Sequence, residues 1–357
     1  LPPGAVHIEY VRYRNYRLAA AGPAAHGAIL ILPSGDPRWI PLGTEEELRL
    51  WLGVMNDRLD HRTARLAGEE SSAPPLKLEA ALQELYTLFF APIEGMLPPG
   101  TETIGLSPDG WLNFVSFAVL LDDYQQFLAT KFRTIVYLGC GRDLLLGAER
   151  PSFRDGPWDL VAIAEFEEPG EGTAGAGLGA LDRAVLDTVR PFQPVPGAID
   201  ELKRIRKTLP NAARGRELKN ARESDLRGLA ESPAVLHLTT HGFFLPSLGK
   251  GSPIDAVHQD FDQQPELFYR AGLVTTEVKT ALTRRARGES IGIEEDGVLF
   301  MDEISSLPLQ RTRLVTLSSC DSGLGQLTGD GVLGLRRGFT RAGADNVLLS
   351  LWPVSDR

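Results

Sequence analysis

After residue 100, short apolar runs rich in β-branched residues alternate with longer amphipathic segments. The runs predict strands at Thr103–Leu106, Thr134–Leu138, Leu160–Ala164, Ala234–Thr239, Arg313–Leu317 and Asn346–Leu351. Between them, the pattern predicts helices at Ala198–Thr208, Glu223–Ala230 and Gly331–Ala342. Strands joined by helical crossovers predict an α/β fold whose mostly parallel sheet has helices on both faces.

The first hundred residues have a different pattern, with strands predicted at Val6–Tyr13 and Ala28–Leu32. Thr44 is predicted to cap a helix that has three glutamates in its first turn. A second amphipathic helix is expected at Leu76–Leu88. Segments rich in Gly, Ser and Pro predict a linker and two loops, at Gly68–Pro75, Gly170–Leu181 and His241–Tyr269.

Composition narrows the function classes. The 357 residues are 43% hydrophobic and 24% charged, as in soluble globular proteins, and the net charge of −10 argues against a nucleic-acid binder. Two cysteines suit a reducing compartment, so we expect a cytoplasmic location. The apolar runs are too short to span a membrane, and the start has no signal-peptide pattern. Because the chain starts at Leu1 and no closing helix is predicted, we expect it to be part of a longer protein.

Two predicted strands end in chemically reactive residues. One strand leads into His241-Gly242, and another leads into Cys320 within a run of small residues. Ligands of parallel sheets bind beyond the carboxyl ends of the strands, so neighbouring strands would bring the two side chains together. A thiol with a pKa of about 8.5 is mostly protonated at neutral pH, and an adjacent imidazole activates it. On the residues alone, a thiol–imidazole pair and a structural role for both residues stay equally open.

The other histidines and the second cysteine are given structural roles. Cys140 follows a predicted strand and is interpreted as a small buried residue, while His237 lies mid-strand and is interpreted as a core residue. The remaining histidines have no reactive neighbours in the sequence; they are His7, His26, His61 and His258.

Several short motifs follow one another along the chain. They are IEYV at 8–11, SPDGWL at 107–112, SFA at 116–118, GRDLL at 141–145, PVPGA at 194–198 with Glu201, LHLTTHGFF at 236–244, LSSCDSG at 317–323, Gly334-Leu335, Ala342-Gly343-Ala344 and SLWPVSD at 350–356. In their order and spacing, the motifs resemble a CHAT domain, a caspase-like and separase-like cysteine peptidase module often attached to tetratricopeptide repeats. The pair Asp321-Ser322 departs mildly from the acidic residue and Thr that are common in the family. In the family, a terminal helical segment follows the equivalent of Trp352–Asp356, and no such segment is predicted here.

The resemblance implies a catalytic dyad, with His241 as the general base and Cys320 as the nucleophile. It implies an oxyanion hole made by the backbone N–H groups of Gly242 and Cys320, and a reaction without metal or cofactor. It also implies an N-terminal β/α extension at 1–75, a non-catalytic, pseudo-peptidase-like half at 76–197 and a catalytic half at 198–357.

The resemblance extends to substrate preference. Trp352–Asp356 is similar to a segment that helps separases to bind a basic P1 residue, so Asp356 and Asp321 are candidates for an acidic P1 pocket. If P1 is basic, the run Arg284–Arg287 is a candidate processing site. The basic stretch at 204–222 is interpreted as a solvated surface, with docking of an acidic partner as the alternative.

The leading hypothesis is a regulated endopeptidase that cleaves a specific protein partner, in the setting of bacterial defence or cell-death signalling. A regulatory region or a protein with tetratricopeptide repeats is a further expected partner, and neither nucleic acid nor membrane is expected to bind. Two alternatives stay open: a catalytically silent scaffold for protein–protein interaction, and an acyltransferase that uses the same thiol–imidazole pair.

Overall fold

The computed structural model describes residues 1–17, 20–67, 77–148, 156–167, 185, 187–189, 192–229, 231–245, 271–292, 295–319, 325–328 and 331–352. The chain divides into two compact units. Unit 1 comprises Leu1–Pro151 with Gly329–Gly331, and unit 2 comprises Ser152–Thr328 with Val332–Arg357.

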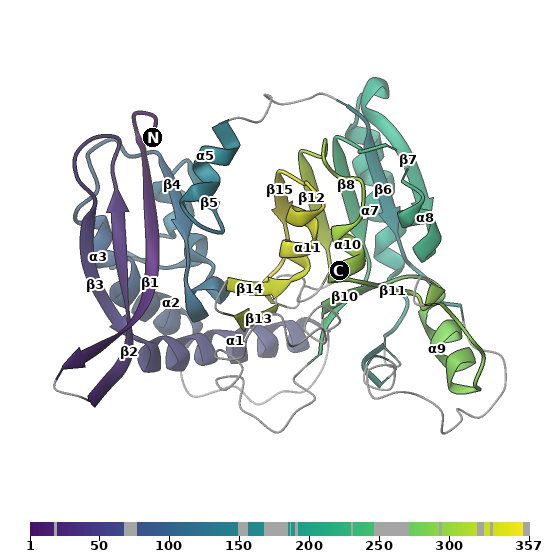
Figure 1. The fold of residues 1–357 in the computed structure, drawn as a ribbon, viewed down its shortest axis with the longest axis horizontal. Coiled ribbons are helices and arrows are strands. Elements are labelled where there is room, and N and C mark those ends of the chain that lie inside the picture. Colours follow the sequence, from purple (N-terminus) through teal and green to yellow (C-terminus); the bar gives the residue numbers. More distant parts are fainter. Residues whose placement is uncertain are drawn as a thin grey trace. The chain divides into compact units, whose positions relative to one another are not determined.

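Unit 1 is built on a five-stranded sheet in the order β3-β2-β1-β4-β5 (Figure 1). Its strands are β1 (Ala5–Arg17), β2 (Ala20–Ile31), β3 (Arg38–Thr44), β4 (Thr103–Ser107) and β5 (Thr134–Tyr137). The hairpin connections make β1, β2 and β3 antiparallel, whereas β1, β4 and β5 are parallel. The sheet of unit 1 is therefore mixed.

Helices of unit 1 follow the amphipathic segments of the sequence. They are α1 (Glu45–Ala67), α2 (Leu78–Phe89), α3 (Ala91–Glu94), α4 (Leu128–Lys131) and α5 (Arg142–Ala148), with 3₁₀ turns η1 (Gly110–Phe114) and η2 (Phe117–Val119). The predicted cap of α1 is confirmed, because the Thr44 hydroxyl accepts from the Glu47 N–H at 3.2 Å and Glu47 accepts from the Thr44 N–H at 2.7 Å. Buried aromatic side chains such as Tyr10, Phe89 and Phe117 form the core.

Unit 2 contains a five-stranded parallel sheet in the order β15-β12-β8-β6-β7. Its strands are β6 (Trp158–Ala162), β7 (Arg214–Lys219), β8 (Val235–Thr239), β12 (Leu314–Ser318) and β15 (Asn346–Leu348). A three-stranded antiparallel sheet consists of β9 (Gly242–Phe244), β10 (Ala271–Val274) and β11 (Val298–Phe300). β13 (Gly325–Thr328) and β14 (Gly331–Gly334) form a two-stranded sheet.

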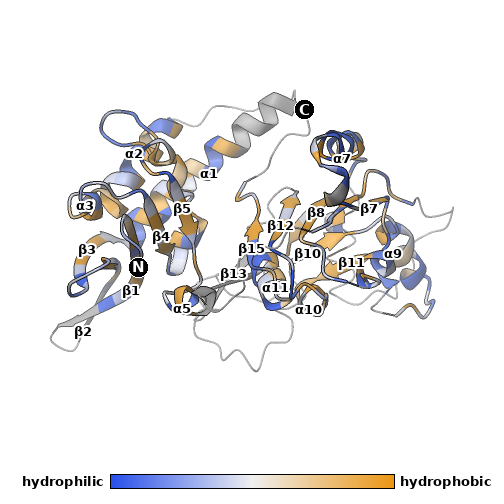
Figure 2. Ribbon diagram, turned by 90° about the horizontal axis from the view of Figure 1, so that it is seen from above, coloured by the Kyte–Doolittle hydropathy of each residue, from blue (hydrophilic) through white to orange (hydrophobic). Residues whose placement is uncertain are grey.

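Helices cover both faces of the parallel sheet in unit 2. On one face, α7 (Pro196–Thr208) packs Ala198 and Leu202 against β6. The opposite face buries a larger cluster that includes residues of α8 (Glu223–Arg227), α10 (Met301–Ser305) and α11 (Leu335–Arg341). Two further elements are α9 (Val278–Ala286) and the 3₁₀ turn η3 (Asn211–Ala213). In Figure 2, much of the β8 ribbon has the colour of hydrophobic residues and much of the α7 ribbon that of hydrophilic residues. The predicted α/β fold with parallel strands and flanking helices is confirmed.

Two of the predicted segments need correction. The helix predicted at Gly331–Ala342 begins only at Leu335, since residues Gly331–Gly334 form β14, where glycines at both ends disfavour helix. The loop predicted from His241 contains β9 at its start, because Gly242–Phe244 pairs with β10. The predicted linker at 68–75 and loop at 170–181 lie outside the described residues.

The boundaries of the two compact units differ from the boundaries of the three ranges predicted from the sequence. β1 pairs with β4, so strands from the range 1–75 and from the range 76–197 share one sheet. Along the chain, the first boundary between the units falls between Pro151 and Ser152. The assignment of 1–75, 76–197 and 198–357 to an extension and two halves stays a prediction.

Candidate active site

The strands β8 and β12 are neighbours in the central sheet of unit 2 and run parallel, with Thr239 opposite Ser318. Beyond the ladder, the Thr240 N–H donates to the Ser318 carbonyl at 3.3 Å. His241 follows Thr239 by two residues, and Cys320 follows Ser318 by two residues. β8 and β12 therefore end at the same edge of the sheet and in equal register. Each candidate residue follows one of these strand ends by two positions in the sequence.

Among the predicted site residues, only His241 and Gly242 are among the described residues. His241 is half-buried between the end of β8 and the start of β9, and Gly242 is the first residue of β9. Cys320, Asp321 and Asp356 lie outside the described residues. The roles assigned to these five residues stay predictions.

The His241 ring has well-defined neighbours. Its Nε2 lies 2.9 Å from the backbone carbonyl oxygen of Gln193. Its face stacks on Phe192, with ring centroids 4.4 Å apart and an interplanar angle of 25°, and on Phe166, with centroids 5.9 Å apart. The Lys279 ammonium lies 5.3 Å from the centre of the Phe166 ring. Aromatic stacking and one hydrogen bond together restrict rotation of the imidazole.

The Gln193 contact decides which ring nitrogen of His241 carries the proton in the neutral imidazole. A carbonyl oxygen only accepts hydrogen bonds, so Nε2 must be the protonated nitrogen that donates. Nδ1 then holds the lone pair and is the nitrogen able to take a proton from a thiol. A group that fixes the tautomer of a catalytic base is the third member of many nucleophile–base arrangements. Here a backbone carbonyl occupies that position.

The hydrogen-bond alternation between β9 and β10 orients the Gly242 N–H. The Val274 N–H donates to the His241 carbonyl at 3.1 Å, and the adjacent register pair is Gly242 with Leu273. In antiparallel strands, bonded and non-bonded pairs alternate, so the Gly242 N–H points away from β10. It is therefore free of the ladder, as an oxyanion donor must be.

The chain just before Cys320 is tied to its surroundings. Ser319 is 5% exposed, and its carbonyl accepts a hydrogen bond from the Ser350 hydroxyl at 2.7 Å. The Ser319 hydroxyl is buried and has no hydrogen-bond partner among the described residues. The bond from Ser350 connects the segment after β12 to the segment after β15.

Comparison with known families identifies the chain. Residues 79–357, most of its length, match the family model of the CHAT domain. This protein belongs to the CHAT domain family. CHAT domains form a caspase-like, peptidase-related family and often occur in association with tetratricopeptide-repeat proteins. No curated protein matches the chain.

The CHAT domain contains a buried acidic cluster that the sequence did not reveal. Glu223 is fully buried, accepts from Arg227 at 2.9 Å and accepts from the Gly297 N–H at 3.2 Å. Burial raises the pKa of Glu223 to about 8, and the nearby carboxylates of Glu303 and Asp296 add to the rise. The cluster joins α8, α10 and the segment that leads into β11. The raised pKa of Glu223 makes the stability of the folded state depend on pH.

Two histidines of unit 1, His7 and His26, are fully buried. His7 was expected to have no reactive neighbours, but its Nε2 lies 2.8 Å from Glu9 and 3.3 Å from the Ser107 hydroxyl. Neighbouring strands β1 and β4 bring these residues together, which the sequence spacing alone did not show. His26 is also fully buried, and burial lowers its pKa to about 4.

The interpretation of Cys140 as a buried residue is wrong, because this thiol is exposed. Its strand, β5, ends at Tyr137, and Cys140 lies in the turn before α5. The N–H groups of Gly139 and Cys140 donate to the Asp143 carboxylate at 2.8 Å and 3.4 Å. Cys140 therefore lies in an exposed turn and is not packed at the end of a strand, as the sequence suggested.

In the part of the CHAT protein that the structure describes, no group of three or more His, Cys, Asp or Glu side chains could hold a metal ion. No helix in the same residues is long and apolar enough to cross a membrane.

Several residues around His241 could not be found from the sequence. Phe166, Phe192 and Gln193 lie far from His241 in the chain and belong to no recognisable motif. Glu201 and His237 were noticed separately, and they are linked through one hydrogen-bonded network. His237 itself is 7% exposed, so its interpretation as a core residue is confirmed.

Proposed function

We propose that this protein is a cysteine endopeptidase in which His241 and Cys320 form the catalytic dyad. The observation that carries the proposal is the parallel pairing of β8 with β12, which ends in equal register before the two residues. Membership of a caspase-like, peptidase-related family supports it independently.

The reaction follows from the tautomer of His241. Nδ1 takes the proton of the Cys320 thiol, and the thiolate attacks the scissile carbonyl carbon. The resulting oxyanion accepts hydrogen bonds from the backbone N–H groups of Gly242 and Cys320, each worth ~3–4 kcal/mol of barrier. The imidazolium then gives its proton to the leaving amine, which breaks the C–N bond and leaves an acyl-enzyme. Water, deprotonated by Nδ1, hydrolyses the thioester and restores the thiol.

A basic P1 residue is the preferred substrate feature. Asp356 and Asp321 would supply carboxylates that pair with Arg or Lys at P1. The substitution Asp356→Ala should reduce cleavage of peptides with Arg at P1 and leave cleavage after Asp at its low level. Equal loss on both peptides would exclude a pocket role for Asp356.

The partner is a specific protein substrate, and a region or protein with tetratricopeptide repeats is a candidate regulator. The family association with such repeats supports the second partner. We place the protein in the cytoplasm and in bacterial defence or cell-death signalling, on the family resemblance and the low cysteine content.

A peptide-library cleavage profile of the wild-type protein beside Cys320→Ala tests the proposal. Cleavage by the wild type that disappears in the variant supports an endopeptidase. Binding of a partner protein by both forms without cleavage would favour the scaffold, and a product carrying a transferred acyl group would favour the acyltransferase.

A further inference from the structure

A polar network lies on the face of the unit 2 sheet that α7 covers. Successive side chains of a strand point to opposite faces, so His237 and Thr239 of β8 share one face. Thr316 of β12 lies on the same face, opposite His237 in the register. Glu201 reaches this face from α7. The network thus joins one helix to the two strands that lead to His241 and Cys320.

The contacts of the network are short and mutually compatible. The His237 Nδ1 lies 2.5 Å from the Thr316 hydroxyl, and its Nε2 lies 3.0 Å from the Thr239 hydroxyl and 3.3 Å from the Glu201 carboxylate. The Thr239 hydroxyl donates to the other Glu201 oxygen at 3.1 Å. With Nε2 protonated, the Thr316 hydroxyl donates to Nδ1, and every polar atom has a partner.

The charge state of Glu201 suits this arrangement. Burial acts to raise the pKa of Glu201, but hydrogen bonds from His237, Ser318 and Thr239 hold it below its usual value. The carboxylate is therefore ionised at neutral pH and acts as acceptor for both strands. Thr239 and Ser318 each stand two residues before a dyad residue.

The Thr316 hydroxyl, the His237 imidazole and the Glu201 carboxylate are hydrogen-bonded in series, as in a catalytic triad. The geometry nevertheless opposes a second catalytic centre here. His237 is 7% exposed, so substrate cannot reach its ring. Thr316 lies in an interior strand between β8 and β15, where the backbone N–H groups belong to the ladders and cannot hold an oxyanion. The network acts on the neighbouring site instead of on a substrate of its own.

We propose that Glu201 is a positioning residue, whose carboxylate fixes the relative position of the β8 and β12 ends that carry His241 and Cys320. The inference rests on the proposed function of that pair. His237 and Thr239 are buried and the Glu201 side chain is partly exposed. A polar network in which every member is satisfied specifies one arrangement of its elements. A displacement of about 1 Å at a reacting pair can cost a hundredfold in rate, so a modest loosening of the strand ends is visible in kcat.

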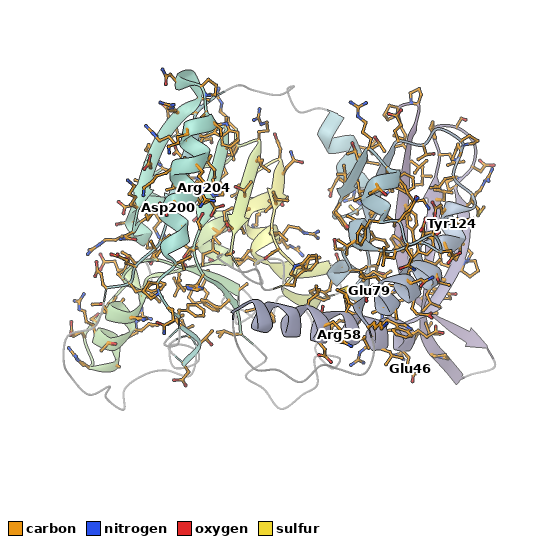
Figure 3. All side chains as sticks on the ribbon, turned by 180° about the vertical axis from the view of Figure 1, so that it is seen from behind. Glu46, Arg58, Glu79, Tyr124, Asp200 and Arg204 are labelled. Carbon is orange, nitrogen blue, oxygen red and sulfur yellow. The ribbon has the colours of Figure 1, made fainter. Side chains whose placement is uncertain are left out.

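The test compares Glu201→Gln and Thr239→Val with the matched control Asp200→Asn. Asp200, labelled with Arg204 on α7 in Figure 3, precedes Glu201 and forms an exposed ion pair with Lys203. Kinetics on the best library peptide are normalised by active-site titration, and thermal unfolding is followed in parallel. Alkylation of Cys320 by iodoacetamide, in a Cys140→Ser background, gives a readout that needs no peptidase activity.

Glu201→Gln and Thr239→Val should each lower kcat by roughly tenfold, with KM within about twofold, while Asp200→Asn matches the wild type. Thr239→Ser, which keeps the hydroxyl, should restore kcat. The alkylation rate of Cys320 should change in the first two variants only. If these variants lower the melting temperature but keep kcat per titrated site and the alkylation rate, the network is merely structural and the proposal is overturned.

The two proposals fail separately. A wild-type protein that cleaves no peptide, but whose Cys320 alkylation changes with Glu201→Gln, refutes the peptidase and supports the positioning role. If the wild-type protein cleaves peptides and its activity is unchanged by Glu201→Gln and Thr239→Val, the peptidase is supported and the positioning role of Glu201 is refuted.

Discussion

His7 in unit 1 and His241 in unit 2 are both associated with parallel strands, but their surroundings differ. His7 lies within β1, is fully buried, and engages Glu9 and Ser107 through the same nitrogen, Nε2. His241 lies just beyond β8, is half-buried, and has its Nε2 held by the Gln193 carbonyl. A base needs one nitrogen fixed and the other accessible. His7 is fully buried, whereas His241 is half-buried and has its Nε2 held. The difference supports the proposal that catalysis belongs to unit 2.

The largest expected effect separates these two histidines. His241→Ala should lower kcat/KM by about 10³-fold or more, because the variant loses both thiol activation and protonation of the leaving amine. His7→Gln should leave kcat/KM per titrated site within about twofold and lower the stability by about 1–3 kcal/mol, since it disturbs a buried hydrogen bond. Titrated kinetics and denaturant unfolding measure both. Similar activity losses in the two variants would remove the distinction between the units.

The next effect concerns the aromatic stack. Phe192→Ala should lower kcat by roughly tenfold with little change in KM, because the His241 ring loses the neighbour 4.4 Å away that restricts its orientation. Trp39→Ala is the control, since this unit 1 aromatic is 49% exposed and lies outside the proposed site. Steady-state kinetics of both variants check this, and an unchanged kcat for Phe192→Ala would show that the stack has no orienting role.

A smaller effect is a pH dependence of unit 2. Glu223 has a pKa of about 8 in the folded state against 4.5 for an ordinary glutamate. A raised carboxyl pKa contributes stability that is fully present below pH 4.5 and is lost as the pH rises through 8. Hydrogen exchange in α8 should therefore accelerate between about pH 5 and 8, after correction for the intrinsic rate. Glu223→Gln should flatten this dependence, and a dependence of equal slope in the variant would assign it elsewhere.

The stability of unit 1 should depend on pH in the opposite direction from that of unit 2, and the expected change is smaller. The pKa of His26 is about 4 when folded and 6.5 in the ordinary state. The unfolded chain takes up the proton first, so stability falls as the pH drops from 6.5 towards 4, by about 2 kcal/mol at about pH 5. His26→Leu should abolish this loss, as seen by hydrogen exchange in β2. Acid loss that persists in the variant would point to another group.

The predictable and unpredictable parts of the molecule have different physical origins. Hydrophobic period and caps predicted the strands β4, β8 and β12 and the start of α1 at Thr44, because these depend on local sequence. Short strands such as β9 and β11 were missed, since a run of three residues carries no period. The exposure of Cys140 was also missed, because the turn into α5 depends on Asp143 accepting from the Gly139 N–H.

The candidate site divides in the same way. The sequence singles out His241 and Cys320 as candidates because each follows an apolar strand and is followed within three residues by a glycine, and their roles stay predictions. The hydrogen bond from His241 to the Gln193 carbonyl and the Glu201 network could not be predicted, since they depend on which elements become neighbours in the folded sheet. A backbone carbonyl also carries no residue signature, so no sequence pattern could have revealed the partner of His241.

The most direct measurement of the central claim is the pH dependence of Cys320 alkylation, in a Cys140→Ser background with and without His241→Ala. If the imidazole and thiol form a pair, the wild-type rate should rise with a midpoint well below the ordinary thiol pKa of about 8.5, and His241→Ala should return it there. Identical midpoints in the two proteins would contradict the pair, and with it the peptidase mechanism.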